Sequence, residues 1–135
     1  MHKESVCPFC LPNDLLKGDI LYDDDLWYFV TAEDGELKLG GMIITKRHVT
    51  SPFEINETEW FRLHKLLPKF KRLLDKHKPH GFNLGWNINT VGGQNVEHAH
   101  LHLFARFEDE PLAGKGIRYV FKQPANKREN QKLKR

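Results

Sequence analysis

The sequence predicts a single α+β domain with a largely antiparallel sheet. Strand-like segments precede and follow one long helical segment, without the regular alternation of strand and helix that builds a parallel sheet. The length of 135 residues suits one domain rather than two. With 39% hydrophobic residues, including 9 Phe, 3 Trp and 3 Tyr, the chain can bury a core, which excludes a wholly disordered protein.

Three strands are predicted before the helix. Residues 20–22 and 26–31 carry β-branched and aromatic side chains and flank an Asp-rich turn at 23–25. A turn at 33–36 follows, and the apolar run G-M-I-I-T at 41–45 indicates a buried strand. About five strands are expected in all.

Residues 56–77 form the predicted helix. Asn56 can cap its first turn, and Glu59 lies three residues later, as a capping box requires. Pro68 cannot donate a hydrogen bond to the His64 carbonyl, so we expect a kink there. The apolar positions step by three and four and predict one buried stripe. These positions are Trp60, Leu63, Leu67, Phe70 and Leu74.

Two further strands are predicted after the helix, joined by the turn T-V-G-G-Q-N at 90–95. Residues 82–89 alternate apolar side chains with Asn and Gly, and the last strand covers residues 98–106. The domain is therefore expected to occupy residues 1–122, with shorter helical pieces beside the main helix.

Basic residues concentrate at the C-terminal end, where residues 115–135 hold eight Lys and Arg against one Glu, although the whole chain has a net charge of only +3. We interpret residues 123–135 as a solvated basic tail, the alternative being an arm that steers anions or binds nucleic acid. No apolar run approaches the roughly 18 to 20 residues that span a bilayer, and no secretion signal is visible, so we expect a cytoplasmic protein.

Cys7 and Cys10 form a C-P-F-C motif. In a reducing compartment so close a pair favours metal or redox chemistry over a structural disulfide. The loop-like residues 11–13 that follow do not match a thioredoxin-type site, so metal binding is favoured. This motif supplies half of a zinc site, and the remaining ligands must come from elsewhere. Two uncoordinated thiols are the alternative.

The segment H-A-H-L-H places His98, His100 and His102 at intervals of two. On a strand all three project from one face, while Ala99 and Leu101 point to the core. His98 and His102 would lie about 13 Å apart, too far to share one ion at a zinc–nitrogen bond of about 2 Å. The three histidines must therefore divide their roles.

The turn before these histidines suits a phosphate. Gly92 and Gly93 can expose backbone N–H groups, and the side chains of Gln94 and Asn95 can donate as well. A neutral imidazole beside a bound phosphate can attack phosphorus and leave again. The alternative is an exposed His-rich strand that binds metals adventitiously.

These residues resemble the histidine triad (HIT) family. The resemblance rests on H-A-H-L-H-L-F preceded by G-G-Q-N-V, and extends to C-P-F-C, I-I-T-K-R-H, the long helix and G-W-N-I-N, with a tail like that of a bacterial branch. It implies a HIT-like α+β fold, commonly a homodimer, and nucleotidyl hydrolase or transferase activity on adenosine phosphoramidates or diadenosine polyphosphates. Neither a catalytic metal nor an organic cofactor is implied, and nucleic acid and membrane are not expected partners.

The resemblance also assigns roles by position. His100 would be the nucleophile that forms a nucleotidyl-histidine intermediate, and His102 would contact the α-phosphate or the leaving group. Asn87 would lie near the scissile phosphate, and Gln94 and Asn95 occupy phosphate-binding positions, although several relatives have Ser in place of Asn95.

Members with the N-terminal motif often hold a structural zinc, and the corresponding ligands here are Cys7, Cys10, His48 and His98. This set agrees with the distance argument, since His98 can face a metal while the other two face a phosphate. The second ring nitrogen of His100 is expected to donate to a carbonyl, which fixes the attacking tautomer.

The sequence departs from the family at two places. The usual P-G-H before the middle strand reads K-L-G at 38–40, so Gly40 replaces a histidine that supports the triad. The acid that holds the ribose hydroxyls has Glu33 or Asp34 as its nearest candidate. The alternative functions are a zinc-stabilised nucleotide-binding module without turnover and a redox role for the two cysteines.

Overall fold

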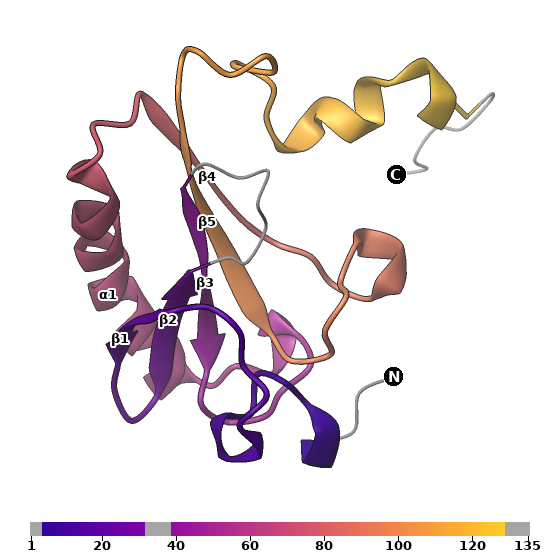
Figure 1. The fold of residues 1–135 in the computed structure, drawn as a ribbon. Helices are drawn as coiled ribbons and strands as arrows, with labels where there is room; N and C mark the ends of the chain where they lie inside the picture. Colours follow the sequence, from indigo (N-terminus) through magenta and orange to yellow (C-terminus); the bar gives the residue numbers. More distant parts are fainter. Residues whose placement is uncertain (1–3, 32–38, 129–135) are drawn as a thin grey trace.

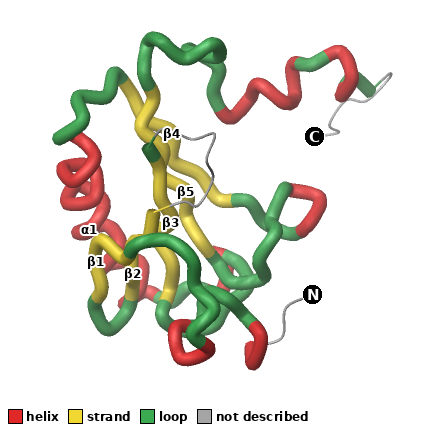
Figure 2. Tube along the Cα trace, in the orientation of Figure 1, coloured by secondary structure: helices red, strands yellow, loops and turns green. Residues whose placement is uncertain are grey.

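The computed structural model describes residues 4–31 and 39–128, and in them five strands form one antiparallel sheet (Figures 1 and 2). The strand order is β1-β2-β3-β5-β4, and each neighbouring pair is antiparallel. The predicted α+β class is therefore confirmed. The strands are β1 (Ile20–Asp23), β2 (Trp27–Thr31), β3 (Gly40–Thr45), β4 (Gly81–Trp86) and β5 (His100–Arg106).

Both strands predicted after the helix are longer than the observed ones. β4 ends at Trp86 instead of residue 89, because Asn89 has a φ of 62°, which is not an extended conformation. β5 begins at His100 instead of residue 98. The His98 amide donates to Val96 O at 2.8 Å within the preceding turn. His98 is thus placed by a turn, not by the sheet.

The helix α1 spans Glu57–Asp75 and begins with the predicted capping box. The Glu59 amide donates to Asn56 Oδ1 at 2.8 Å, and the Asn56 amide donates to Glu59 Oε1 at 3.0 Å. α1 is continuous through Pro68, which lies on the exposed side of the helix with His64, where water can replace the missing donor.

Three of the five positions predicted for the buried stripe of α1 are buried, and two are not. Leu66 is buried, whereas Trp60 is 40% exposed and Leu67 is half-buried. The Trp60 ring instead makes an edge contact with Trp86 of β4. The side chains that α1 buries against the sheet are Leu63, Leu66, Phe70 and Leu74.

The two faces of the sheet are covered by different parts of the chain. α1 packs on one face, against Trp27, Phe29 and Ile43 among others (Figure 1). The N-terminal segment packs on the other face, where a smaller apolar cluster forms. This cluster, called the N-terminal cluster below, consists of Cys7, Phe9, Cys10, Tyr28, Val30 and Ile44.

The chain after β5 runs through a loop, residues 107–116, into two short 3-10 helices at Ile117–Lys122 and Pro124–Asn126. Arg106 ties this loop down, because its guanidinium donates to Lys115 O at 2.8 Å and Leu112 O at 3.0 Å. The predicted tail at 123–135 lies partly outside the described residues. No helix of the described part is long and apolar enough to cross a membrane.

Candidate active site and metal cluster

The alternation along β5 places the last two histidines as predicted. Leu101 and Leu103 are buried on the α1 face, and His100 and His102 lie on the opposite face. The N-terminal cluster covers the part of that face that holds His98 and His100, whereas His102 is only partly buried. His98 is fully buried and His100 is 6% exposed.

The C-P-F-C turn and two histidines form a cluster that can hold a metal ion. The ligand atoms of Cys7, Cys10, His48 and His98 all lie within 4.8 Å of one another. Cys10 Sγ is 3.1 Å from His48 Nδ1 and 3.6 Å from His98 Nδ1, and Cys7 Sγ is 3.4 Å from His98 Nδ1. A tetrahedral zinc with bonds of about 2.0 to 2.3 Å needs ligand atoms roughly 3.3 to 3.8 Å apart. Both distances to His98 Nδ1 lie in this range and the distance from Cys10 Sγ to His48 Nδ1 is slightly shorter, so small side-chain shifts let these four residues hold a zinc ion.

The donor atoms of the cluster also have the required chemistry. Thr45 O lies 2.7 Å from His98 Nε2, so Nε2–H donates to it and the Nδ1 lone pair faces the sulfur atoms. Burial lowers the pKa of His98 to about 4, which keeps the ring neutral. Burial, followed by the hydrogen bond with Cys7, raises the pKa of the Cys10 thiol to about 12. A bound cation reverses this preference and favours the thiolate.

The position of His48 depends on an ion pair beside it, in which the carboxylate is buried and the guanidinium is half-exposed. Arg47 donates to Glu59 Oε1 at 2.8 Å and to Oε2 at 3.2 Å, and Glu59 is 2% exposed. Burial disfavours the charged carboxylate, but the Arg47 guanidinium and the Asn56 amide outweigh it and hold the pKa of Glu59 below its usual value. The segment that carries His48 is thereby fixed to the first turn of α1.

His100 has the tautomer that a nucleophile needs. Its Nδ1 lies 2.7 Å from His98 O, so Nδ1–H donates to this carbonyl and the Nε2 lone pair is available. The expected carbonyl partner is therefore present. Burial lowers the pKa of His100, although the His98 carbonyl opposes the shift.

His102 lies between the rings of His100 and Phe104, at centroid distances of 5.0 and 5.3 Å. Its Nδ1 is buried and makes no hydrogen bond to a described residue. Burial, and secondarily His100, lowers the pKa of His102 to about 4. The ring lines a cleft of about 290 Å³ together with Asn87 and Ile117.

Phe104 occupies the space beside Gly40, where the family usually has a histidine. A Cβ atom built on Gly40 would overlap the Phe104 ring, so a side chain does not fit there without movement of this ring. The Phe104 ring stacks on His102 with an interplanar angle of 30°. The Phe104 ring of β5 therefore lies against both position 40 and His102.

The glycine turn differs from the prediction. The amides of Gly92 and Gln94 both donate to Asn89 O, and the Gly93 amide donates to Thr90 O, each at 3.0 Å. These N–H groups close the turn and do not point outward to an anion. The prediction that Gly92 and Gly93 expose their amides is wrong, because the turn forms a short 3-10 helix, Thr90–Gly92.

The Gln94 side chain is likewise committed within the protein. Its Nε2 donates to Thr50 O at 2.8 Å and Val96 O at 3.0 Å, and its Oε1 accepts from the Asn89 amide at 2.8 Å. Gln94 is buried and holds the turn against the loop that follows β3.

The remaining predicted substrate residues lie on the surface. Asn87 and Asn95 are exposed, and the Asn95 amide makes no hydrogen bond to another described residue. Gly93 has a φ of 99°, and a Cβ there would lie 3.5 Å from Asn87 Cγ, so the turn packs against the Asn87 side chain. Glu33 and Asp34 lie outside the described residues.

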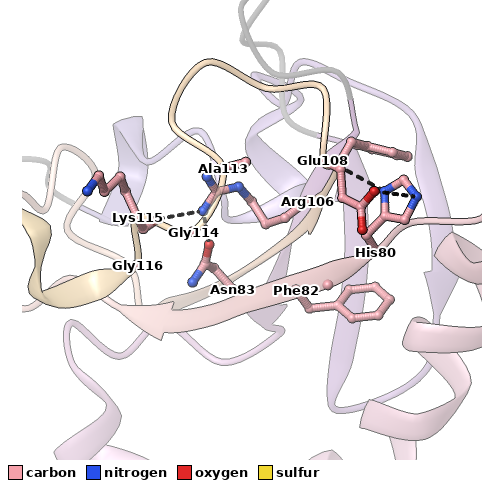
Figure 3. Close-up of a pocket in the computed structure, with 11 residues that line it drawn as sticks. His80, Phe82, Asn83, Arg106, Glu108, Ala113, Gly114, Lys115 and Gly116 are labelled. Carbon is pink, nitrogen blue, oxygen red and sulfur yellow. Dashed lines mark hydrogen bonds and ion pairs between the residues drawn. The ribbon is translucent and has the colours of Figure 1, made fainter.

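A second cleft, of about 330 Å³, lies at the other end of β4 and β5 (Figure 3). Gly81 pairs with Arg106 there, whereas Trp86 pairs with Leu101 near the histidines. Arg106 lies between Asn83 and the 107–116 loop, and its guanidinium donates to Asn83 Oδ1 and to Glu110. This cleft contains none of the predicted site residues.

Three residues beside the predicted ones were not identified from the sequence. Phe9 contacts the His100 ring, Thr45 accepts the His98 hydrogen bond, and Phe104 stacks on His102. The position of Phe9 between the two cysteines could have identified it from the sequence. Phe104 follows His102 by two on β5, which places both on one face.

Comparison with known proteins identifies the family. The HIT domain family model matches residues 15–109, which is more than half of the chain, and the chain therefore belongs to the HIT family.

Solved structures and a sequence relative agree with this assignment. A HIT family protein from Bacillus anthracis has a TM-score of 0.70 at 26% identity, covering 76% of this chain and 74% of that one. A HIT family hydrolase from Clostridium thermocellum has a TM-score of 0.63 at 25% identity, covering 78% and 94%. An AP-4-A phosphorylase from Mycobacterium tuberculosis is 32% identical over 68 residues, which is 49% of this chain and 35% of that protein.

Proposed function

We propose that this protein is a nucleotidyl hydrolase or transferase that acts on a nucleoside phosphoramidate or a dinucleoside polyphosphate. The observation that carries the proposal is the hydrogen bond from His100 Nδ1–H to His98 O, which leaves Nε2 as a neutral nucleophile. The relatives support the substrate class, since one is named a hydrolase and another an AP-4-A phosphorylase.

The reaction consists of two displacements at phosphorus. In the first, His100 Nε2 attacks the α-phosphorus; a bond between nitrogen and phosphorus forms, and the bond to the leaving group breaks. From a dinucleoside polyphosphate, the second nucleoside leaves with the remaining phosphates as an anion. From a phosphoramidate, the amine leaves and takes a proton from solvent. In the second, water attacks the phosphorus, its proton passes to solvent, and His100 is released together with the nucleoside monophosphate. In the transferase reaction, another acceptor replaces water.

His102 and the turn at 89–95 stabilise the charge that develops on the phosphate. The buried Nδ1 of His102 has no hydrogen-bond partner among the described residues. A buried N–H without a partner costs more free energy than a lone pair without one, so we assign the proton to Nε2. Nε2–H then donates to a phosphate or leaving-group oxygen. The Asn87 side chain and the backbone N–H of Asn95 are the further donors. Gly93 and Gln94 shape the turn. Asp34 is proposed to hold the ribose.

A structural zinc ion bound by Cys7, Cys10, His48 and His98 cross-links the N-terminal turn to the loops that follow β3 and precede β5. The ion takes no part in the displacements in this proposal. Elemental analysis is expected to find one zinc per chain, and none after replacement of both cysteines by serine. A reducible disulfide and no zinc would instead favour redox chemistry.

The proposal includes a cytoplasmic homodimer. In the described part of the sheet, β4 has β5 as its single neighbour, and its Leu84 is 42% exposed. An edge strand of this kind can pair with a second chain. Light scattering after size exclusion is expected to give the mass of two chains.

Single-turnover trapping tests the reaction. The protein is mixed with adenosine phosphoramidate or diadenosine polyphosphate carrying a labelled α-phosphate, and acid-labile label is expected on His100. His100→Ala should lose the adduct and slow monophosphate release by at least about 1000-fold. His64→Ala, which alters an exposed histidine of α1, is the matched control and should behave as the wild type. Nucleotide binding with neither adduct nor monophosphate would favour a binding module.

A further inference from the structure

The turn that carries the two cysteines also touches the nucleophile. Phe9 lies between Cys7 and Cys10, and its side chain is 8% exposed. Its ring meets the His100 ring at a centroid distance of 5.0 Å and an interplanar angle of 82°, which is an edge contact. A second edge contact, at 6.2 Å and 72°, joins Phe9 to His98.

The backbone of Phe9 is fixed independently of its ring. Tyr28 on β2 is fully buried, and its hydroxyl donates to Phe9 O at 2.6 Å. The cysteine on each side of Phe9 belongs to the metal cluster. The Phe9 ring is therefore held from the sheet and from the cluster, and it has little freedom to move away from His100.

Within residues 4–31 and 39–128, the His100 ring makes one hydrogen bond, from Nδ1–H to His98 O. A bond at one ring atom fixes the tautomer, but the direction of Nε2 also depends on the groups packed against the ring. These groups include the rings of Phe9 and His102, each at a centroid distance of 5.0 Å. Of these, Phe9 belongs to the cysteine turn, and the carbonyl belongs to the metal ligand His98.

We infer that Phe9 is a positioning residue for His100, and that the C-P-F-C turn couples the metal cluster to the direction of the nucleophile. This inference rests on the proposed function. The cluster fixes His98 and the turn, His98 O orients Nδ1 of His100, and the Phe9 ring limits rotation of the imidazole. Since a misplacement of about 1 Å can slow a reaction about 100-fold, such packing affects the rate without contact to the substrate.

The test replaces Phe9 by leucine, which keeps an apolar side chain but removes the aromatic edge. Phe53→Leu is the matched control, because Phe53 is 83% exposed. Phe9→Leu is expected to slow single-turnover formation of the His100 adduct at least about tenfold, with KM within twofold of the wild type and one zinc per chain retained. Phe53→Leu should leave all three quantities unchanged.

A spectroscopic measurement on the zinc-loaded protein without substrate provides a second readout. The long-range ¹H–¹⁵N spectrum of the imidazoles should show a single Nδ1–H tautomer for His100 in the wild type and in Phe53→Leu. In Phe9→Leu the His100 signals should broaden or shift, and chelation of the zinc should produce a similar change in the wild type.

Three results would overturn the inference. The first is an adduct rate for Phe9→Leu within twofold of the wild type. The second is a slower rate that follows loss of zinc in proportion, since Phe9 would then only hold the cluster. The third is an unchanged His100 spectrum. If the wild type forms no adduct, the proposed function fails, whereas the spectrum still shows whether Phe9 positions the ring.

Discussion

The two faces of the sheet bury side chains of different chemistry. The α1 face buries an apolar core that includes Phe29, Ile43 and Phe70. The opposite face has the smaller N-terminal cluster, which includes Cys7 and Cys10 and adjoins the other two metal-ligand candidates and the histidines of β5. Hydrophobic burial is sufficient to hold the first face, whereas the second also depends on imidazole hydrogen bonds to carbonyls and, in our proposal, on zinc.

β5 contributes side chains to both faces, because successive residues of a strand point to opposite sides of the sheet. Leu101 and Leu103 contribute to the α1 core, while His100 and His102 lie on the other side. Burial of a neutral imidazole carries an unfavourable desolvation free energy, whereas burial of an aliphatic side chain does not. We call the side of the sheet that holds His100 and His102 the histidine face. We therefore expect substitutions on the α1 face to change stability alone, and substitutions on the histidine face to change both stability and activity.

The largest effect is expected on the α1 face, for Phe70→Ala. Phe70 is fully buried, and its ring packs on Phe29 at a centroid distance of 4.7 Å. Its removal leaves a cavity and should lower the free energy of unfolding by about 4 kcal/mol. Urea unfolding measures this change, and the turnover of the folded fraction should stay at the wild-type value.

Phe61→Ala is the matched control on the same helix. Phe61 is 63% exposed, so its removal should change the free energy of unfolding by no more than about 0.5 kcal/mol. A slower turnover of folded Phe70→Ala would contradict the separation of the two faces, because it would show that the α1 core also positions the site.

Most of the α1 face could be predicted from the sequence. Helical periodicity and the capping residues located α1, and period-two alternation located the buried side chains of β5. Trp60 was misassigned, because periodicity alone does not show that Trp86 lies beside it on the neighbouring edge strand. Packing between segments distant in the sequence decided that position.

On the histidine face, the sequence identified which residues take part but not how they are arranged. The spacing of the histidines indicated divided roles, but it did not show that His98 precedes the strand. The glycine turn was misinterpreted, because the composition does not show where the amides donate, and here they close a 3-10 turn. Gly40 was noticed as a departure, but the Phe104 ring that fills its space could be found only from the paired strands.

A second effect, of about 3 kcal/mol, is expected on the histidine face on acidification. Burial lowers the pKa of His102 to about 4 in the folded protein, against about 6.5 in the unfolded chain. Between these values the unfolded chain binds more protons, so this contribution to stability is complete above about pH 6.5 and is lost as the pH falls to about 4. Urea unfolding between pH 7 and 4 measures it.

His102→Gln removes this titration and should flatten the pH dependence by about that amount. His64→Gln replaces an exposed histidine and should keep the wild-type dependence. Equal slopes in the wild type and His102→Gln would show that the imidazole is not buried as described.

The smallest effect, about 2 kcal/mol, is expected for Gly40→Ala, and it is the sharpest test of the comparison. The added methyl group must displace the Phe104 ring, which stacks on His102. Gly81→Ala is the matched control, because Gly81 lies in the same sheet and a Cβ there meets no atom within 4 Å. Gly40→Ala should lower both the free energy of unfolding and the rate of monophosphate release, whereas Gly81→Ala should lower neither. Gly40→Ala could instead be less stable but release monophosphate at the wild-type rate. The Phe104 ring would then contribute to packing only, and its position would not affect the reaction.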